Sequence, residues 1–102
     1  MPKILTDAQI EQWGATGALW PIDLLSTEEA AHYYRRFNEL EKSIGGEAQE
    51  RFRIKAHLPF PWLWDLVTNP KLADMVEDLI GPDIVCWGSS FFTKKAHDPR
   101  FI

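Results

Sequence analysis

Residues 79–95 read LIGPDIVCWGSSFFTKK, and this stretch decides the fold that we expect for the chain. The Gly-Pro-Asp sequence at residues 81–83 is typical of a helix end followed by a tight turn. The residues after the turn are rich in β-branched and aromatic side chains, which favours one long strand buried on at least one face. Side chains alternate along a strand, so Ser90 and Phe92 would share one of its faces.

Four helices are predicted upstream of this strand. Two begin with a capping box, in which Thr6 or Ser26 is followed three residues later by Gln or Glu. The other two begin with a proline, which is favoured in the first turn of a helix. The expected helices cover residues 7–16, residues 27–43, a short stretch from Pro61, and the stretch that follows Asn69.

The region between the second and third helices predicts a loop and a further strand. Residues 47–50 are polar and predict a loop, whereas residues 52–56 alternate between apolar and charged side chains as a strand does. Lys55 lies in this alternating segment, with Arg53 on the same side. A lysine held by a strand suits the binding of a small dicarboxylate, and a solvated strand lysine is the alternative. Helices combined with strands predict the α+β class.

Size and composition limit the classes of function. The 102 residues are enough for one small domain, and the net charge of -4 without a basic stripe argues against nucleic acid as the main partner. No stretch approaches the length needed to span a membrane, so no membrane partner is expected. The single cysteine, Cys86, excludes an internal disulfide and fits a cytoplasmic protein.

The three histidines and Cys86 predict no metal site and no catalytic residue within this chain. Iron sites built from two histidines and a carboxylate commonly use a local His-x-Asp or His-x-Glu pair, which none of the three histidines forms. His57 follows the predicted strand and could line a cleft, and a turn histidine with a satisfied hydrogen bond is the alternative. Cys86 is expected to be a small buried side chain. The tryptophans expected in the core are Trp62, Trp64 and Trp87.

Three segments resemble a known family. They are LTDAQIEQWGATGALWPIDLLSTEEA at residues 5–30, RIKAHLPFPWLWDLVTNPKLADMVEDLIGPDIVCWGSSFF at residues 53–92, and TKKAHDPRF at residues 93–101. Together they resemble the N-terminal part of the phytanoyl-CoA dioxygenase family of iron(II)/2-oxoglutarate-dependent oxygenases. The second segment is the most specific, because its helix, Leu-Ile-Gly-Pro-Asp-Ile turn and Trp-Gly-Ser strand recur in that order and spacing.

The resemblance implies an incomplete barrel. Family members fold as a double-stranded β-helix, a cupin-like jelly roll preceded by helices, so residues 1–102 would supply the helices and the first strands. The family holds iron with a His-x-Asp motif and a distal histidine, and the first of these usually begins just after the Asp-Pro segment. Ile102 stands at about that position. We therefore expect the metal-binding part to be absent, and this chain alone to be inactive and to bind neither iron(II) nor 2-oxoglutarate tightly.

The resemblance also implies roles for individual residues. Lys55, Ser90 and Phe92 would line the cosubstrate pocket, and His57 would lie near the substrate. The intact protein would hydroxylate a small organic molecule. The alternative is a truncated, non-catalytic relative that acts as a binding or assembly module and forms oligomers through unpaired strands. A chance resemblance of a small α+β domain is the remaining possibility.

Overall fold

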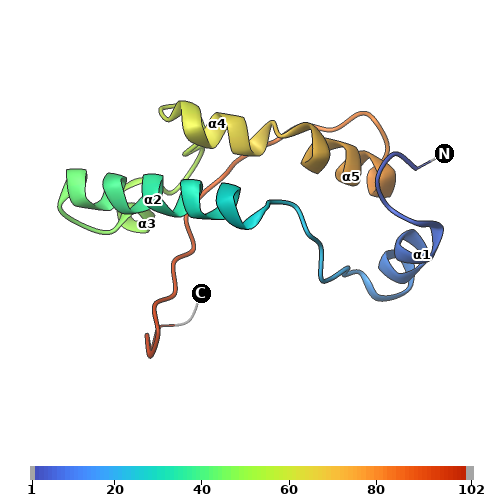
Figure 1. Cartoon of the computed structure of the whole chain (residues 1–102), viewed down its shortest axis with the longest axis horizontal. Helices are drawn as coiled ribbons and strands as arrows, with labels where there is room; N and C mark the ends of the chain where they lie inside the picture. The colour runs from blue at the N-terminus through green and yellow to red at the C-terminus, as the bar shows by residue number, and fades with distance from the viewer. Residues whose placement is uncertain (1, 101–102) are drawn as a thin grey trace.

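The computed structural model describes residues 2–100, and its regular elements are helices. Four of them stand where the sequence predicts them, and the fifth, α3, replaces the predicted loop at residues 47–50. None of the described helices combines the length and the apolar character needed to cross a membrane. The helices are α1 (Asp7–Thr16), α2 (Thr27–Ile44), α3 (Ala48–Arg51), α4 (Pro61–Val67) and α5 (Pro70–Ile80) (Figure 1).

The predicted capping boxes begin the first two helices. The Gln9 backbone N–H donates to Thr6 Oγ1 at 3.1 Å, and the Glu29 N–H donates to Ser26 Oγ at 3.0 Å. In both helices the side chain of the third residue returns a bond to the backbone of the cap. Because these contacts lie within a few residues of each other, the sequence alone predicted them correctly.

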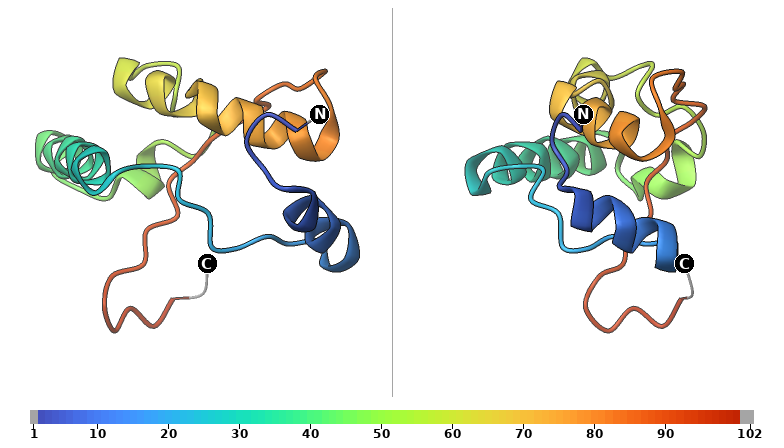
Figure 2. Two further views of the ribbon diagram at one scale, coloured as in Figure 1. Left: turned by 45° about the vertical axis from the view of Figure 1, so that its right-hand side comes forward. Right: turned by 90° about the vertical axis from the view of Figure 1, so that its right-hand side faces the viewer.

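The helices form two rows. Helices α4 and α5 follow one another in the upper row of Figure 1, with α2 below α4 and α1 below α5. Figure 2 shows the same two rows from other sides, with the extended linker that joins α1 and α2 within the lower row. Helix α1 packs against α5, and α3 packs against α2. After α5 the chain runs back along the upper row and then passes α2 on its way to the C-terminus.

The predicted long strand is wrong, because residues 81–95 are extended but have no neighbouring strand. No strand occurs among residues 2–100, so the α+β class and the jelly-roll, double-stranded β-helix architecture are wrong for the part of the chain described. A strand needs a ladder of hydrogen bonds to a second strand. Here the segment has one backbone bond of this kind, from the Ala56 N–H to the Ser89 carbonyl oxygen at 3.2 Å.

The second predicted strand, at residues 52–56, is also wrong. Lys55 has φ of 56°, which lies in the left-handed region, and strands need negative φ throughout. The Leu58 N–H donates to the Lys55 carbonyl oxygen at 3.0 Å and closes a turn. Alternation of apolar and charged residues therefore does not make a strand here, because the backbone turns before any partner can pair with it.

The core is thin for a chain of this size. The Cα radius of gyration is 15.7 Å, whereas a compact domain of about 100 residues has roughly 13 Å. The accessible surface is 7809 Å², against roughly 5,900 Å² for a folded monomer of this mass. The buried apolar residues are Leu5, Leu40, Ala48, Ala56, Leu63 and Met75.

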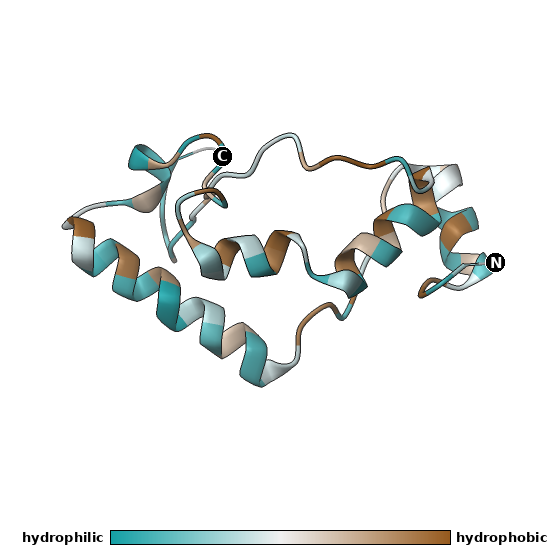
Figure 3. Cartoon of the chain, turned by 90° about the horizontal axis from the view of Figure 1, so that it is seen from above, coloured by the Kyte–Doolittle hydropathy of each residue, from teal (hydrophilic) through white to brown (hydrophobic). Residues whose placement is uncertain are grey.

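Several side chains expected in the core lie at the surface instead. Trp87 is 82% exposed, Trp64 is 50% exposed, and Cys86 is exposed as well. Trp87 and Cys86 both belong to the extended segment, so the lack of a neighbouring strand explains their exposure. Figure 3 shows that the hydrophobic part of this segment runs clear of the helices.

Candidate functional site

The candidate site is the crossing, which we define as the place where residues 55–58 meet residues 88–93. The Ser89 hydroxyl accepts a hydrogen bond from the His57 backbone N–H at 3.2 Å and bonds the His57 Nδ1 atom at 2.5 Å. The Ala56 N–H donates to the Ser89 carbonyl oxygen. One serine therefore fastens both the backbone and the side chain of a segment 32 residues away in the sequence.

His57 is buried at the crossing, with 5% of its surface exposed. Its ring lies 6.0 Å from that of Trp64 on α4, measured between centroids, at an interplanar angle of 32°. The imidazole is thus enclosed between a serine hydroxyl and an aromatic ring. This arrangement is that of a turn histidine with a satisfied hydrogen bond, and it leaves little of the ring free to touch a substrate.

An aromatic cluster behind the crossing holds the extended segment against the helices. Phe91 packs between Phe37 of α2 and Trp62 of α4, with centroid distances of 5.3 Å and 6.5 Å. Phe60 continues the cluster, 6.1 Å from Trp62. Aromatic pairs at these separations stabilise by roughly 0.5–1.5 kcal/mol beyond their buried area. The cluster therefore positions Ser90 and Phe92, which flank Phe91.

Two adjoining surface hollows lie along the extended segment, and Arg53, Ser90 and Phe92 line both of them. Their volumes are about 330 Å³ and about 290 Å³. Phe92 is 76% exposed, so the hollows are open to solvent. Lys55 is not among the residues that line either hollow. The structure therefore places Ser90 and Phe92 at the same hollows, joins His57 to the neighbouring Ser89, and leaves Lys55 on the turn outside the hollows.

Arg53 is a lining residue that the sequence analysis did not single out. Its Nη2 atom lies 3.2 Å from Glu50 Oε2, and its Nε donates to the Glu50 carbonyl oxygen at 3.3 Å. The sequence placed Arg53 only on the same side as Lys55. Its position beside Ser90 depends on the turn at residues 55–58, which no local pattern predicts.

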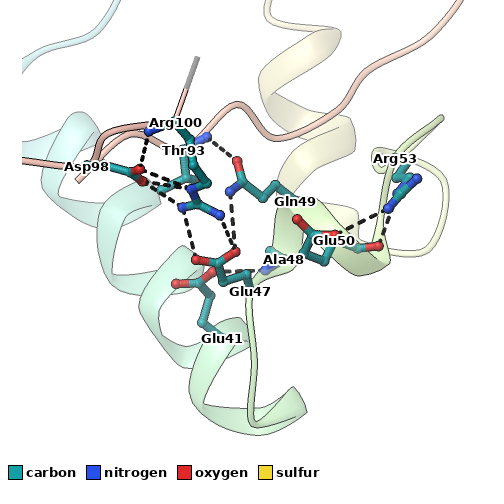
Figure 4. A network of polar contacts seen from close by, with 9 residues as sticks. All are labelled: Glu41, Glu47, Ala48, Gln49, Glu50, Arg53, Thr93, Asp98 and Arg100. Atoms are coloured by element: carbon teal, nitrogen blue, oxygen red, sulfur yellow. Dashed lines mark hydrogen bonds and ion pairs between the residues drawn. The ribbon is translucent and has the colours of Figure 1, made fainter. Parts of the chain in front are cut away.

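An ion-pair network fastens the far end of the extended segment to the corner between α2 and α3 (Figure 4). Arg100 binds Glu47 at 2.9 Å and Asp98 at 2.6 Å. Hydrogen bonds from Arg100 lower the pKa of Asp98 from its usual 3.8 to about 2, and they also lower the pKa of Glu47. The Thr93 N–H donates to Gln49 Oε1 at 2.9 Å. Both ends of the segment that carries Ser90 and Phe92 are therefore held.

The chemistry of the hollows suits a small organic anion. A guanidinium group pairs with carboxylates through parallel hydrogen bonds, a hydroxyl adds a further bond, and an aromatic ring covers the apolar part of a ligand. Residues 2–100 contain no group of three His, Cys, Asp or Glu side chains placed to hold a metal ion.

No family model, no curated protein and no solved structure matches this chain. The resemblance in sequence and the geometry of the crossing are therefore the two grounds for a functional interpretation. They concern the same residues, since the second resembling segment, residues 53–92, contains all of the crossing except Thr93.

Proposed function

We propose that this chain is the N-terminal portion of a non-haem iron(II)/2-oxoglutarate-dependent dioxygenase that hydroxylates a small organic substrate. The observation that supports the proposal is the crossing. It brings Ser90 and Phe92, which the resemblance assigns to the cosubstrate, to the lining of both hollows, next to Ser89, which bonds His57 from a segment 32 residues away. Lys55 is the first residue of the crossing and lines neither hollow. We place this activity in the cytoplasm, because a single cysteine fits a reducing compartment.

The reaction of the proposed enzyme consumes 2-oxoglutarate, oxygen and a C–H bond, and it yields succinate, carbon dioxide and the hydroxylated product. In this proposal the described residues form one wall of the pocket and position organic groups. Iron would be held by residues outside the described part. Arg53 and Lys55 would bind a carboxylate of the cosubstrate, and Phe92 would cover its apolar carbons.

The gene itself provides the first test. Reading the coding sequence past the codon for Ile102 should show a His-x-Asp motif within a few codons and a further histidine later. If neither is present, the proposal is wrong. Isothermal titration of the 102-residue chain with iron(II) and with 2-oxoglutarate should show no tight binding. Tight binding of both would contradict our assignment of the metal ligands to another part of the protein.

A kinetic test then addresses Lys55 and Arg53 in the protein that the complete reading frame encodes. Succinate formation from 2-oxoglutarate with iron(II) and oxygen should show a higher KM for 2-oxoglutarate in Lys55→Ala and Arg53→Ala. A lost charge-assisted hydrogen bond is worth roughly 1.5–3 kcal/mol, which corresponds to roughly a 10- to 100-fold higher KM. Lys42→Ala removes a lysine in the last turn of α2 that lines neither hollow, and it serves as the control. Equal KM values in all variants would exclude the assigned roles.

A second candidate function, a binding or assembly module, is favoured by the exposed extended segment. Val85, Trp87 and Phe92 are 88%, 82% and 76% exposed, although they are large and apolar. Contiguous apolar surface beside an unpaired edge is typical of a surface that another chain covers. A dye that fluoresces on apolar surfaces should bind the isolated chain, and less should bind to the triple variant Val85→Ser/Trp87→Ser/Phe92→Ser. Absence of dye binding by the native chain would exclude this candidate.

A further inference from the structure

One edge of the extended segment is occupied and the other is open. Backbone groups of alternate residues in an extended chain point to opposite edges. The Ser89 carbonyl bonds Ala56 and the Thr93 N–H bonds Gln49, so the odd-numbered residues point toward the rest of the molecule. The even-numbered residues then point the other way. On that side the Gly88 carbonyl accepts only from the Cys86 thiol, a weak donor, at 3.6 Å within residues 2–100, and the Ile84 N–H at the start of the segment donates to the Pro82 carbonyl oxygen at 3.0 Å.

Residues 83–95 are complementary to a second copy of the same residues that runs in the opposite direction. We consider an antiparallel pair of two copies with the two-fold axis at Ser89. Asp83 then stands opposite Lys95, and Trp87 stands opposite Phe91. The even-numbered residues, whose backbone groups point to the open edge, would form the hydrogen bonds between the two copies. The odd-numbered pairs are then the non-hydrogen-bonded pairs, in which side chains contact each other most closely. The register thus joins opposite charges at both ends and aromatic rings beside the centre.

The charged side chains of this register are exposed. Asp83 forms no ion pair with residues 2–100. Lys95 lies beside the loop that ends the segment, forms no ion pair with residues 2–100 either, and contributes to the lowered pKa of Glu47 and Asp98. Trp87 would contact the exposed part of Phe91 in the second copy, whose ring also packs between Phe37 and Trp62 of that copy. Val85 would stand opposite Thr93, and β-branched pairs are favourable across strands.

We propose that residues 83–95 pair antiparallel with the same residues of a second copy of this chain, with Ser89 on the two-fold axis. The occupant of the open edge is thus the chain itself, chosen by the complementarity of Asp83 and Lys95. The inference rests on the assembly candidate and names its partner. It is independent of the dioxygenase activity.

Sedimentation equilibrium of the 102-residue chain tests the pairing, with reductant present so that the exposed Cys86 forms no disulfide. We expect a reversible dimer. Asp83→Lys and Lys95→Asp should each raise the dissociation constant about fivefold or more, since each change turns two attractive pairs into repulsive ones. The double variant Asp83→Lys/Lys95→Asp should return it to within about twofold of the native value. A monomer at all concentrations, or a double variant no tighter than the single ones, overturns the proposal.

The register has its own control. Lys94→Asp changes the same charge one residue away, where the register places Ile84, so it should weaken the dimer less than Lys95→Asp does. Equal weakening overturns the register. As a second measurement, Val85→Cys/Thr93→Cys in a Cys86→Ser background should form covalent dimers on oxidation. Within one extended chain these positions lie about 26 Å apart, far beyond disulfide reach, so no internal bond competes.

The outcomes separate this inference from the functions proposed above. If the chain binds the dye but remains monomeric, self-pairing is excluded, and the assembly candidate requires a different partner. A monomeric chain overturns the pairing but does not affect the dioxygenase proposal, which its own kinetic test decides. A dimer whose variants behave as expected supports the pairing, whatever the activity of the complete protein.

Discussion

Ser89 is the residue on which the candidate site depends most directly. Its hydroxyl holds the backbone N–H and the ring of the buried His57, while its carbonyl oxygen holds Ala56. These are the hydrogen bonds that join the turn at residues 55–58 to the extended segment. Without the hydroxyl, two polar groups of His57 would remain buried and unpaired.

Ser89→Ala should lower the free energy of unfolding by roughly 1–3 kcal/mol, the cost of leaving buried polar groups without a partner. Urea unfolding followed by tryptophan fluorescence measures the change. Ser90→Ala removes the same hydroxyl at the neighbouring half-buried position, away from His57, and is the control. If both variants lose equal stability, the Ser89–His57 bond is not the main link.

Asp98 makes a second prediction at the scale of single residues. Hydrogen bonds from Arg100 hold its pKa at about 2, below the usual 3.8. A carboxyl whose pKa is lower in the folded state stabilises the fold fully above about pH 4 and loses this contribution as the pH falls through about 2. NMR titration should show a pKa of about 2 in the native chain and a value near 3.8 in Arg100→Gln. Arg53→Gln, in which a different guanidinium is removed, should leave Asp98 unchanged.

At the scale of elements, α5 organises the N-terminal part of the chain through Asp78. Its carboxylate accepts hydrogen bonds from the backbone N–H groups of Lys3, Ile4 and Leu5 at 2.7, 2.8 and 2.9 Å. Hydrogen bonds from these three groups, with Leu5 contributing most, lower the pKa of Asp78. Asp78 therefore holds the backbone of the segment that leads into α1, and Glu77 of the same helix binds the Lys3 side chain at 2.8 Å.

Asp78→Asn should loosen this segment, because a neutral amide is a weaker acceptor than a carboxylate for three N–H groups. Amide hydrogen exchange of residues 3–5 should become faster at neutral pH. In the native chain the same loosening should appear as the pH falls through the lowered pKa of Asp78, since protonation removes the charge. Asp74→Asn, which removes only the 3.6 Å ion pair to Lys3, is the control. Unchanged exchange in Asp78→Asn would contradict the role of this residue.

At the scale of the whole molecule, stability and exposed apolar surface are located in different places. The buried apolar residues belong to the helices, to the turn at residues 55–58 and to the segment that leads into α1, whereas the most exposed ones, Val85 and Trp87, belong to the extended segment. The radius of gyration also exceeds that of a compact domain, and the extended segment contributes to this because it is not packed into a sheet.

Two substitutions should separate these regions when both are measured on the monomer. Leu63→Ala, at a position that is 8% exposed, should lower the free energy of unfolding by about 2–5 kcal/mol through the cavity that it leaves. Trp87→Ser should change it by less than about 0.5 kcal/mol, as surface substitutions usually do. Urea unfolding monitored by circular dichroism gives both values. A larger effect of Trp87→Ser would mean that the segment is buried in the folded monomer.

The amino-acid sequence by itself determined the positions of four helices and their caps. Thr6 with Gln9 and Ser26 with Glu29 form their bonds across three residues, and Gly17 and Gly45 end their helices in the left-handed conformation. Such contacts are local, so their residue types predict them without knowledge of distant parts of the chain. The turn at residues 81–83 is also local, and the Ile84 N–H donates to the Pro82 carbonyl oxygen at 3.0 Å.

Only the tertiary structure decided whether the β-rich segment becomes a strand. Residues 84–95 have the composition of a strand, but a strand exists only where a second one supplies hydrogen bonds, and the described chain supplies a single turn that contacts Ser89. The same lack of a partner places Cys86 and Trp87 at the surface. The turn at Lys55, which the tertiary structure also decides, brings Arg53 beside Ser90. Pairing between distant segments depends on the path of the whole chain, and local residue patterns do not encode that path.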